Sequence, residues 1–282
     1  MQSESLLQKE TPSYTNGPIR TEYALDNNAA QTRARFDALS AIFDPGTIRH
    51  LEDRGIRSGW KCLEVGGGSG TIAEWMSERV GPKGQVVVTD INTRFLEHLT
   101  HANIKVLQHD IVTDKLPEQA FDIVHARLVL MHLPQRDDVL RRLIRALKPG
   151  GWLVDEEFDA ISLLPNPNVN PNEADLKTTL ALTGVLTQRG VDLRFGRFVF
   201  GRLRALGLVE LGVQARLSMG TGRSVEASLI RSNFEQLRNE MIATGHVTAQ
   251  DVEDDLKRLD DPDSLLLTPT LWAAWGRRPE AL

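Results

Sequence analysis

Residues 61–70, which read KCLEVGGGSG, decide the fold of this 282-residue chain. A short apolar run contains the acid Glu64, and glycines then alternate in a Gly-x-Gly-x-Gly pattern before an amphipathic stretch that begins near Thr71. Strand, tight turn and helix in this order are typical of the ligand-binding edge of a doubly wound α/β sheet. Glycine suits such a turn because the backbone bends sharply and approaches a ligand closely, which leaves no room for a Cβ atom.

Two well-known glycine loops do not fit these residues. The dinucleotide-binding loop requires a third small residue at position 71, where Thr71 stands, and the phosphate-binding loop requires a lysine that is missing here. The pattern that does fit is Glu-x-Gly-x-Gly-x-Gly, with Glu64 as its acid. In this segment the chain resembles the class I S-adenosylmethionine (SAM) methyltransferases, whose first motif has this form.

Further segments follow in the order that this resemblance implies. Residues 85–90 read as a second buried strand that ends at Asp90, about 20 residues beyond the glycines, where a carboxylate can accept from both ribose hydroxyls. Ile91 beside it can pack against a purine. Residues 104–108 read as a third strand, and the resemblance implies that Asp110, just after it, accepts from the adenine amino group.

The fourth and fifth strands complete the resemblance. Residues 121–127, FDIVHAR, are similar to the fourth strand of the family, and residues 147–154, LKPGGWLV, are similar to its turn into the fifth. The resemblance implies that the fourth-strand tip lines the methionine end of the cofactor. The residues expected to bind SAM, or its product S-adenosylhomocysteine (SAH), are Glu64, Gly66, Gly67, Gly68, Gly70, Asp90, Ile91, Asp110, Ile111, His125, Ala126 and Arg127.

Composition limits the classes of partner. A net charge of −5 gives no electrostatic reason to expect nucleic acid as a partner. The single cysteine, Cys62, excludes an internal disulfide and reads as a small core residue of the first strand. No apolar run reaches the length of a membrane span, and the N-terminus lacks a basic, apolar signal sequence. We therefore expect a cytoplasmic protein without membrane contacts, and a homodimer remains open.

The expected fold is a doubly wound, mainly parallel, seven-stranded sheet whose last strand is antiparallel. We expect a flexible arm over residues 1–20, a helical cover over 21–58 that breaks at Asp44-Pro45-Gly46, and a SAM-binding core over 59–160. The remaining residues, 161–282, complete the core. They are expected to contain helices at 173–189 and 195–206, a sixth strand at 208–217, a helical lid at about 222–262 with a capped helix start at Thr248, and a final strand at 265–276.

Methyl transfer depends on how well the acceptor is aligned with the methyl group of SAM. The sulfonium methyl of SAM is already activated, so its transfer is an in-line displacement, and a base is needed only where the acceptor carries a proton. His125 at the fourth-strand tip is either that base, since its ordinary pKa is near neutrality, or a wall that packs against the cofactor. In the acidic run 155–157, Glu156 and Glu157 are the next candidates, and a solvated loop start is the alternative. No metal site is expected.

The sequence therefore predicts a SAM-dependent methyltransferase of a small molecule, such as a secondary metabolite or a quinone-like acceptor. The fourth-strand tip lacks the Asp/Asn-Pro-Pro-Tyr/Phe run used on amino groups of nucleobases or glutamine, which argues against those acceptors. Two alternatives stay open. One is a methyltransferase of a protein or peptide, and the other is a domain that binds SAM without transferring its methyl group.

Overall fold

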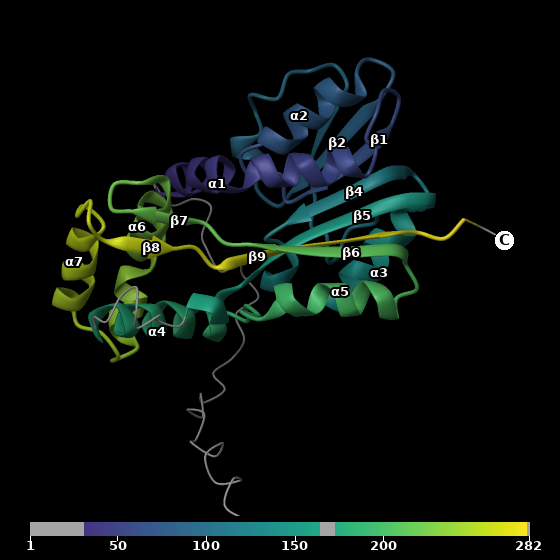
Figure 1. The fold of residues 1–282 in the computed structure, drawn as a ribbon. Coiled ribbons are helices and arrows are strands. Elements are labelled where there is room, and N and C mark those ends of the chain that lie inside the picture. Colours follow the sequence, from purple (N-terminus) through teal and green to yellow (C-terminus); the bar gives the residue numbers. More distant parts are fainter. Residues whose placement is uncertain (1–30, 164–172, 281–282) are drawn as a thin grey trace, which may run out of the picture.

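The structure is a computed structural model that describes residues 31–163 and 173–280 (Figure 1). The expected arm over 1–20, and residues 21–30 of the expected cover, lie outside these residues. The strands of the main sheet are β1 (Lys61–Val65), β2 (Gln85–Asp90), β3 (Ile104–Gln108), β4 (Phe121–Arg127), β5 (Leu147–Asp159), β6 (Val209–Arg216) and β9 (Thr270–Arg277).

The topology of this sheet confirms the predicted fold class. Its strand order is β3-β2-β1-β4-β5-β9-β6. Strands β1 to β5 pair in parallel, and β9 runs antiparallel between β5 and β6. Parallel strands buried on both faces require helices on both sides of the sheet.

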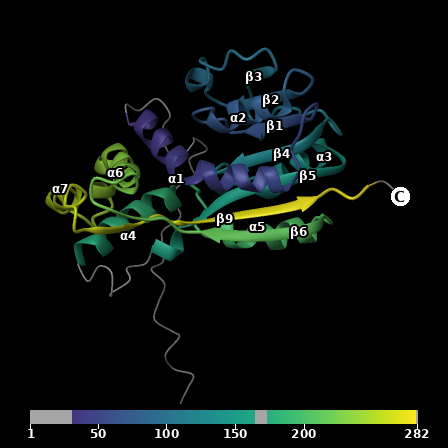
Figure 2. The same ribbon diagram turned by 45° about the horizontal axis from the view of Figure 1, so that its top comes forward.

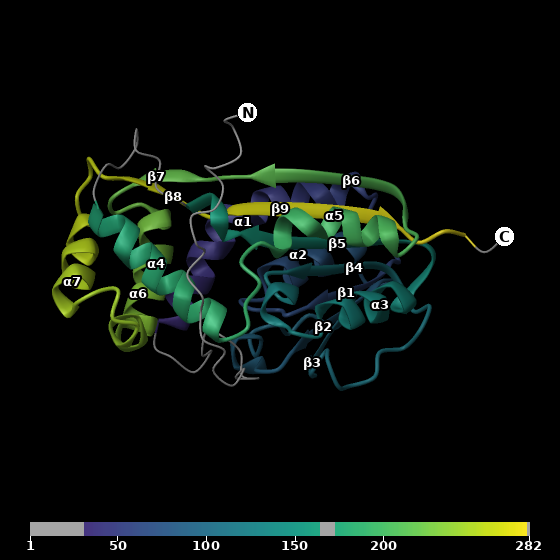
Figure 3. The same cartoon turned by 90° about the horizontal axis from the view of Figure 1, so that it is seen from below.

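Two pairs of helices supply this cover. Helices α1 (Thr32–Asp53) and α2 (Thr71–Val80) lie on one face, and α3 (Arg136–Ala146) and α5 (Phe195–Ala205) lie on the other (Figures 1 and 3). Successive strand residues point to opposite faces. Thus Cys62 belongs to the core beneath α2, whereas Leu63 belongs to the core above α3 and α5.

A separate helical unit stands beside one end of the sheet (Figure 1). It contains α4 (Glu173–Gln188), α6 (Val225–Ala243), α7 (Ala249–Arg258) and a small sheet of β7 (Met219–Thr221) and β8 (Leu265–Leu267). Its own apolar core includes Phe234, Met241 and Leu266. The predicted helices over 173–189 and 195–206 are present, α6 lies within the segment predicted to be helical, and a capping box between Thr248 and Asp251 begins α7 as predicted.

The predicted helix break at Asp44-Pro45-Gly46 is wrong. Helix α1 continues from Thr32 to Asp53 with Pro45 inside it, and Figure 2 shows the helix bent. Proline removes one backbone donor and bends a helix. The helix continues because both of its halves bury side chains, including Phe43 before the proline and Leu51 after it.

The predicted final strand over 265–276 is also wrong, because it is two strands in different sheets. Strand β8 pairs with β7 in the helical unit, whereas β9 pairs with β5 and β6 in the main sheet. Pro269 lies between them. Proline has no backbone N–H to donate to a ladder, so pairing stops before it and resumes after it. Three short 3-10 helices complete the described elements: η1 (Thr93–Phe95), η2 (Leu130–His132) and η3 (Ala160–Leu163).

Candidate cofactor and catalytic site

A cavity opens at the carboxyl ends of β1, β2 and β4, on the side covered by α1. This is the place where doubly wound sheets bind ligands. Most of the residues predicted to bind SAM line this cavity. They are Glu64, Gly66, Gly67, Gly68, Asp90, Ile91, Asp110, Ile111 and Arg127.

The glycine loop needs its glycines for two different reasons. Gly66, Gly68 and Gly70 have φ values of 70°, 54° and 81°, a left-handed backbone that favours glycine. A Cβ atom on Gly66 would lie 2.4 Å from a methyl carbon of Val129, so this glycine also allows close packing. A Cβ atom on Gly68 would have no neighbour closer than 3.9 Å, so it would extend into the cavity. Gly70 does not line the cavity and instead precedes α2.

Asp90 is tied to the glycine loop by its carboxylate. Its Oδ2 accepts from the Gly68 N–H at 3.2 Å, and its Oδ1 accepts from the Asn92 N–H at 2.9 Å. Burial raises the pKa of Asp90, and these backbone hydrogen bonds partly oppose the rise. Next to it, Ile91 is 49% exposed, a large apolar side chain on the cavity wall that can pack on a flat ligand.

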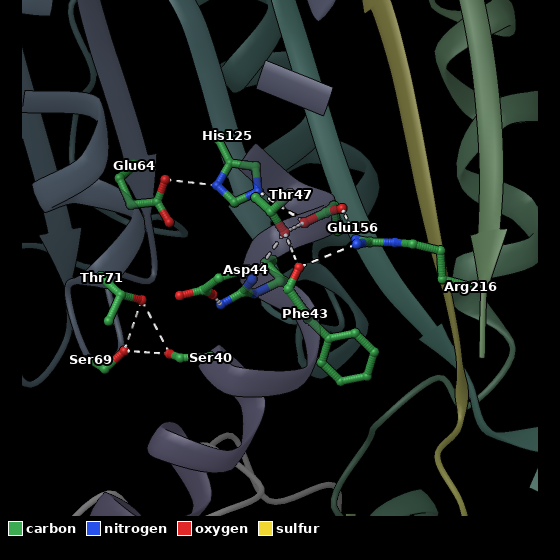
Figure 4. Close-up of polar contacts among 11 residues, drawn as sticks. Ser40, Phe43, Asp44, Thr47, Glu64, Ser69, Thr71, His125, Glu156 and Arg216 are labelled. Carbon is green, nitrogen blue, oxygen red and sulfur yellow. Dashed lines mark hydrogen bonds and ion pairs between the residues drawn. The ribbon is translucent and has the colours of Figure 1, made fainter. Parts of the chain in front are cut away.

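Helix α1 forms one wall of the cavity. The sequence analysis predicted a helical cover here but not which of its residues face the cavity. Phe36, Leu39 and Ser40 line the cavity. The Ser40 hydroxyl lies 2.9 Å from that of Ser69 and 3.1 Å from that of Thr71, which fastens α1 to the glycine loop (Figure 4). These residues are distant in sequence from the loop, so no local pattern could identify them.

The turn after β4 supplies further lining residues that sequence reasoning missed, among them Leu128 and Val129. Leu128 has a φ of 57°, which is rare for a residue with a branched side chain. Backbone conformations of this kind concentrate at functional sites. His109, which follows β3, also lines the cavity.

The prediction that His125 faces the crevice is wrong. His125 is fully buried and, like Ala126, does not line the cavity. Strand register places it beside Glu64, and its Nδ1 lies 2.7 Å from Glu64 Oε2, while its Nε2 lies 3.4 Å from Glu156 Oε2 (Figure 4). Burial lowers the pKa of His125, but the charges and hydrogen bonds of these two carboxylates outweigh burial and raise it to about 9.

The three acids 155–157 are not the solvated loop start that was one of the predicted alternatives. All three are fully buried, because β5 continues beyond them to Asp159 between two neighbouring strands. Burial raises the pKa of Glu156, but its hydrogen bond to His125 and the positive charges of His125, Arg127 and Arg216 lower it to about 2. Like His125, Glu156 does not line the cavity.

The neighbours of Glu156 have different surroundings. Glu157 accepts from the backbone N–H groups of Val129, Leu130 and Met131, at 3.2, 2.6 and 3.3 Å, and so holds the turn after β4. Asp155 lies on the same face of β5, and neither of its oxygens has a hydrogen-bond partner among the described residues.

Neither a metal-binding cluster nor a membrane-spanning helix occurs among the described residues. Residues 31–163 and 173–280 contain no group of three or more His, Cys, Asp or Glu side chains suited to a metal ion. No helix in these same ranges has the length and apolar character needed to cross a membrane.

The sheet order and the glycine-loop cavity together define the class: the fold is that of the class I methyltransferases. Residues 63–155 match the family model described as "Methyltransferase domain". The ubiquinone/menaquinone biosynthesis C-methyltransferase UbiE of Pseudomonas putida (strain GB-1) is 34% identical over 138 residues, which cover 44% of this chain. The match covers 54% of that relative, so the chain spans about half the length of the curated relatives it matches.

Solved structures support the fold alone. Phosphoethanolamine N-methyltransferase 2 of Haemonchus contortus, bound to phosphomonomethylethanolamine and SAH, superposes with a TM-score of 0.57 at 17% identity, over 94% of this chain and 61% of that one. The YcgJ protein of Bacillus subtilis gives a TM-score of 0.53 at 13% identity, over 83% of this chain and 97% of that one.

Proposed function

We propose that this protein is a SAM-dependent methyltransferase that transfers the methyl group to a small-molecule acceptor, of a quinone-like or secondary-metabolite type. The observation that carries the proposal is the cavity beneath α1. It brings the left-handed glycine loop together with Asp90 and Asp110, within the segment that matches the methyltransferase domain.

Each part of the cavity has a proposed partner on the cofactor. The Asp90 carboxylate would accept from the ribose hydroxyls, Ile91 would pack on the adenine, and Asp110 would accept from the adenine amino group. Charge-assisted hydrogen bonds of this kind are each worth about 1.5–3 kcal/mol. Glu64, at the end of β1, would attract the cationic amino group of the methionine part.

We propose that α1 and the helical unit of α4, α6 and α7 form the walls of the acceptor pocket. Helix α1 lines the cofactor cavity with Phe36, and its Ala38 shares a buried apolar cluster with Leu229 of α6. We propose that α1 acts as a cover and the helical unit as a lid. The C-methyltransferase name of the relatives, which belongs to those proteins, supports a quinone-like acceptor for this chain.

Catalysis in this proposal depends on alignment, because the sulfonium methyl group is already activated. A general base has to reach the proton it removes, through a direct hydrogen bond or one water molecule. His125 and Glu156 are fully buried away from the cavity wall, so we propose that neither is the base. We propose that both side chains are charged and that they hold neighbouring side chains, such as Glu64 and Arg216, in position.

Two measurements test the function. The first is thermal unfolding with SAM, SAH or NAD: a ligand at about 100 times its dissociation constant should stabilise the protein by about 2.7 kcal/mol. We expect a shift with SAM and SAH. A shift with NAD alone would contradict the proposal.

The second measurement uses methyl-labelled SAM with a panel of hydroquinones and a metabolite extract, and follows SAH release and the labelled product. Label in the small-molecule fraction is the expected result. Label in the protein fraction would favour a protein or peptide methyltransferase, and SAM binding without SAH release would favour a binding domain. Asp90→Ala is the matched control, because it removes the ribose acceptor and should abolish labelling at low SAM concentration.

A further inference from the structure

Charged side chains from four strands form a row, shown in Figure 4, that begins at the wall of the cofactor cavity. The row begins at Glu64 on β1 and continues through His125 on β4 and Glu156 on β5 to Arg216 on β6. The His125 ring lies 2.7 Å from the Glu64 carboxylate on one side and 3.4 Å from the Glu156 carboxylate on the other. Arg216 Nη2 donates to Glu156 Oε1 across 2.7 Å.

Stability alone does not account for this row. His125 and Glu156 are fully buried, and Glu64 is 4% exposed, so each charge has lost most of its hydration. Well-packed apolar side chains often replace buried ion pairs with no loss of stability. The residues next to them on this face, such as Cys62 and Ile123, are apolar. We therefore expect a residue at one end of the row to have a role in ligand binding.

The end that meets the cavity is Glu64, which lines the cavity wall. Its Oε2 is held by His125, while Figure 4 shows its other oxygen pointing away from that ring. Among the described residues, that second oxygen has no hydrogen bond with a protein group. A carboxylate in this state has one oxygen fixed by the protein and one available to a cationic ligand group.

We propose that His125, held in turn by Glu156, is a positioning residue that fixes the Glu64 carboxylate for the cationic amino-acid end of the cofactor. This inference rests on the proposed function, because that function supplies the cofactor. It gives His125 a role other than base or wall, since the ring touches neither the cavity nor the reacting atoms.

Glu156 has a second group of contacts that links the row to the cover helix. The Thr47 hydroxyl of α1 donates to Glu156 Oε2, and Arg216 Nη1 donates to the Phe43 carbonyl at 3.2 Å. Arg127, which lines the cavity, donates to Thr47 at 3.0 Å and to Asp44 at 2.7 Å. These contacts surround the bend of α1 at Pro45. One buried carboxylate thus holds both Glu64, through His125, and the helix that covers the cavity.

The test uses two ligands that differ only in the part expected to reach Glu64. SAH carries the amino-acid end, and 5′-methylthioadenosine keeps the adenosine and sulfur without it. Calorimetry on His125→Gln should show SAH affinity lowered at least about tenfold, the size expected for a charge-assisted hydrogen bond, with methylthioadenosine affinity changed by less than about twofold. His50→Gln is the matched control: His50, on α1, is also buried, its ring lies against Trp275, and neither of its ring nitrogens has a hydrogen-bond partner in the described residues. It should leave both affinities unchanged.

A double-mutant cycle separates positioning from general damage. If His125 acts through Glu64, then His125→Gln should lower SAH affinity in the wild-type background and have no further effect in Glu64→Gln. This comparison uses folded variants that keep Glu156, whose own removal endangers the fold. Additive losses in the cycle would overturn the inference.

The other outcomes are equally decisive. Equal loss of both ligands in His125→Gln would show a structural role only, and unchanged SAH affinity would show that His125 positions nothing. Wild-type protein that binds methylthioadenosine but not SAH would overturn this inference together with the SAM assignment. If the wild type binds SAH and His125→Gln binds it with the same affinity, the positioning role is overturned and the proposed function remains intact.

Discussion

The backbone N–H of Gly68 donates a hydrogen bond to Oδ2 of Asp90 across 3.2 Å. The glycine loop and the tip of β2 are therefore one unit, although the sequence presents them as separate motifs 22 residues apart. The carboxylate that is proposed to bind the ribose also fixes the loop that faces the rest of the cofactor. Loss of Asp90 would disturb both.

We expect Asp90→Ala to lower SAH affinity more than Asp110→Ala does. Asp90→Ala removes two proposed ribose hydrogen bonds and the anchor of the loop, and hydrogen bonds to a charged group contribute about 1.5–3 kcal/mol each. Asp110→Ala removes one proposed contact with adenine and should lower SAH affinity by about tenfold. Asp90→Ala should lower it by about a hundredfold or more, because two such bonds are lost. Isothermal calorimetry measures both, and equal affinities for the two variants would contradict the assignment of Asp90.

Gly68→Ala should weaken cofactor binding more than its effect on stability explains. Gly68 and Gly207 both have left-handed backbones, with φ values of 54° and 83°, so alanine at either position should cost about 1 kcal/mol of folding stability. Only Gly68 lines the cavity, and a Cβ atom on Gly207 would have no neighbour within 4 Å. Gly207→Ala is therefore the matched control. Calorimetry with SAH should detect a loss in Gly68→Ala alone, and similar SAH affinities in the two variants would argue against cofactor in this cavity.

The sequence was sufficient to predict the parallel strands of the main sheet and the position of its cavity, because these depend on local signals. Short apolar runs at 61–65 and 85–90 indicate buried strands, and the glycines after the first run indicate a tight turn, without reference to the rest of the chain. The carboxyl ends of parallel strands then meet at one edge, which brings Glu64 and Asp90 to the same cavity.

The rest depends on contacts that no local pattern encodes. His125 was placed at the crevice, but strand register decides whether a residue faces the cavity or a neighbouring carboxylate. Burial of 155–157 follows from the position of β5 inside the sheet, which a run of three acids did not suggest. Phe36 lines the cavity from α1, a helix that continues through Pro45, although proline usually marks a helix end.

Phe36→Ala should increase the dissociation rate of SAH. Phe36 lines the cavity and meets Phe95 edge to face, with ring centroids 5.3 Å apart. An aromatic contact of this geometry contributes about 0.5–1.5 kcal/mol to the closed position of α1. Its loss should therefore raise the population of the open cover, and with it the dissociation rate of SAH, by about two- to tenfold. Stopped-flow displacement of SAH measures this rate. Phe198→Ala, on α5 and 45% exposed away from the cavity, is the control, and an unchanged rate in Phe36→Ala would show that α1 is not a cover.

The contribution of His125 to stability should depend on pH. Its pKa is raised from 6.5 to about 9 because Glu64 and Glu156 outweigh burial. A group whose pKa is raised on folding stabilises the native state fully below its unfolded pKa, and this stabilisation is lost as pH rises through the folded pKa. The difference in unfolding free energy between wild type and His125→Gln should therefore be largest below pH 6.5 and smallest above about pH 9. Urea denaturation at several pH values measures it, and a difference that grew with pH would mean that the ring is neutral.

Asp155→Asn should make the protein less sensitive to alkaline pH. Asp155 is fully buried between β4 and β9, and neither of its oxygens has a hydrogen-bond partner among the described residues. Burial raises its pKa from 3.8 to about 8; the charge of His125 opposes the rise and that of Glu156 adds to it. The native state therefore keeps a proton that the unfolded chain releases. The resulting stabilisation is complete below pH 3.8 and is lost as pH rises through about 8.

Asparagine has no such proton and keeps nearly the same shape. Between about pH 5 and 9 the wild type should lose at least about 1 kcal/mol more unfolding free energy than Asp155→Asn, since each unit of pKa shift corresponds to 1.36 kcal/mol. Urea denaturation at the two ends of this range gives the difference. Asp263→Asn, which removes an exposed carboxylate, should keep the wild-type pH dependence. Parallel pH profiles for wild type and Asp155→Asn would show that Asp155 is ionised inside the folded sheet, and that some cationic partner compensates its charge there.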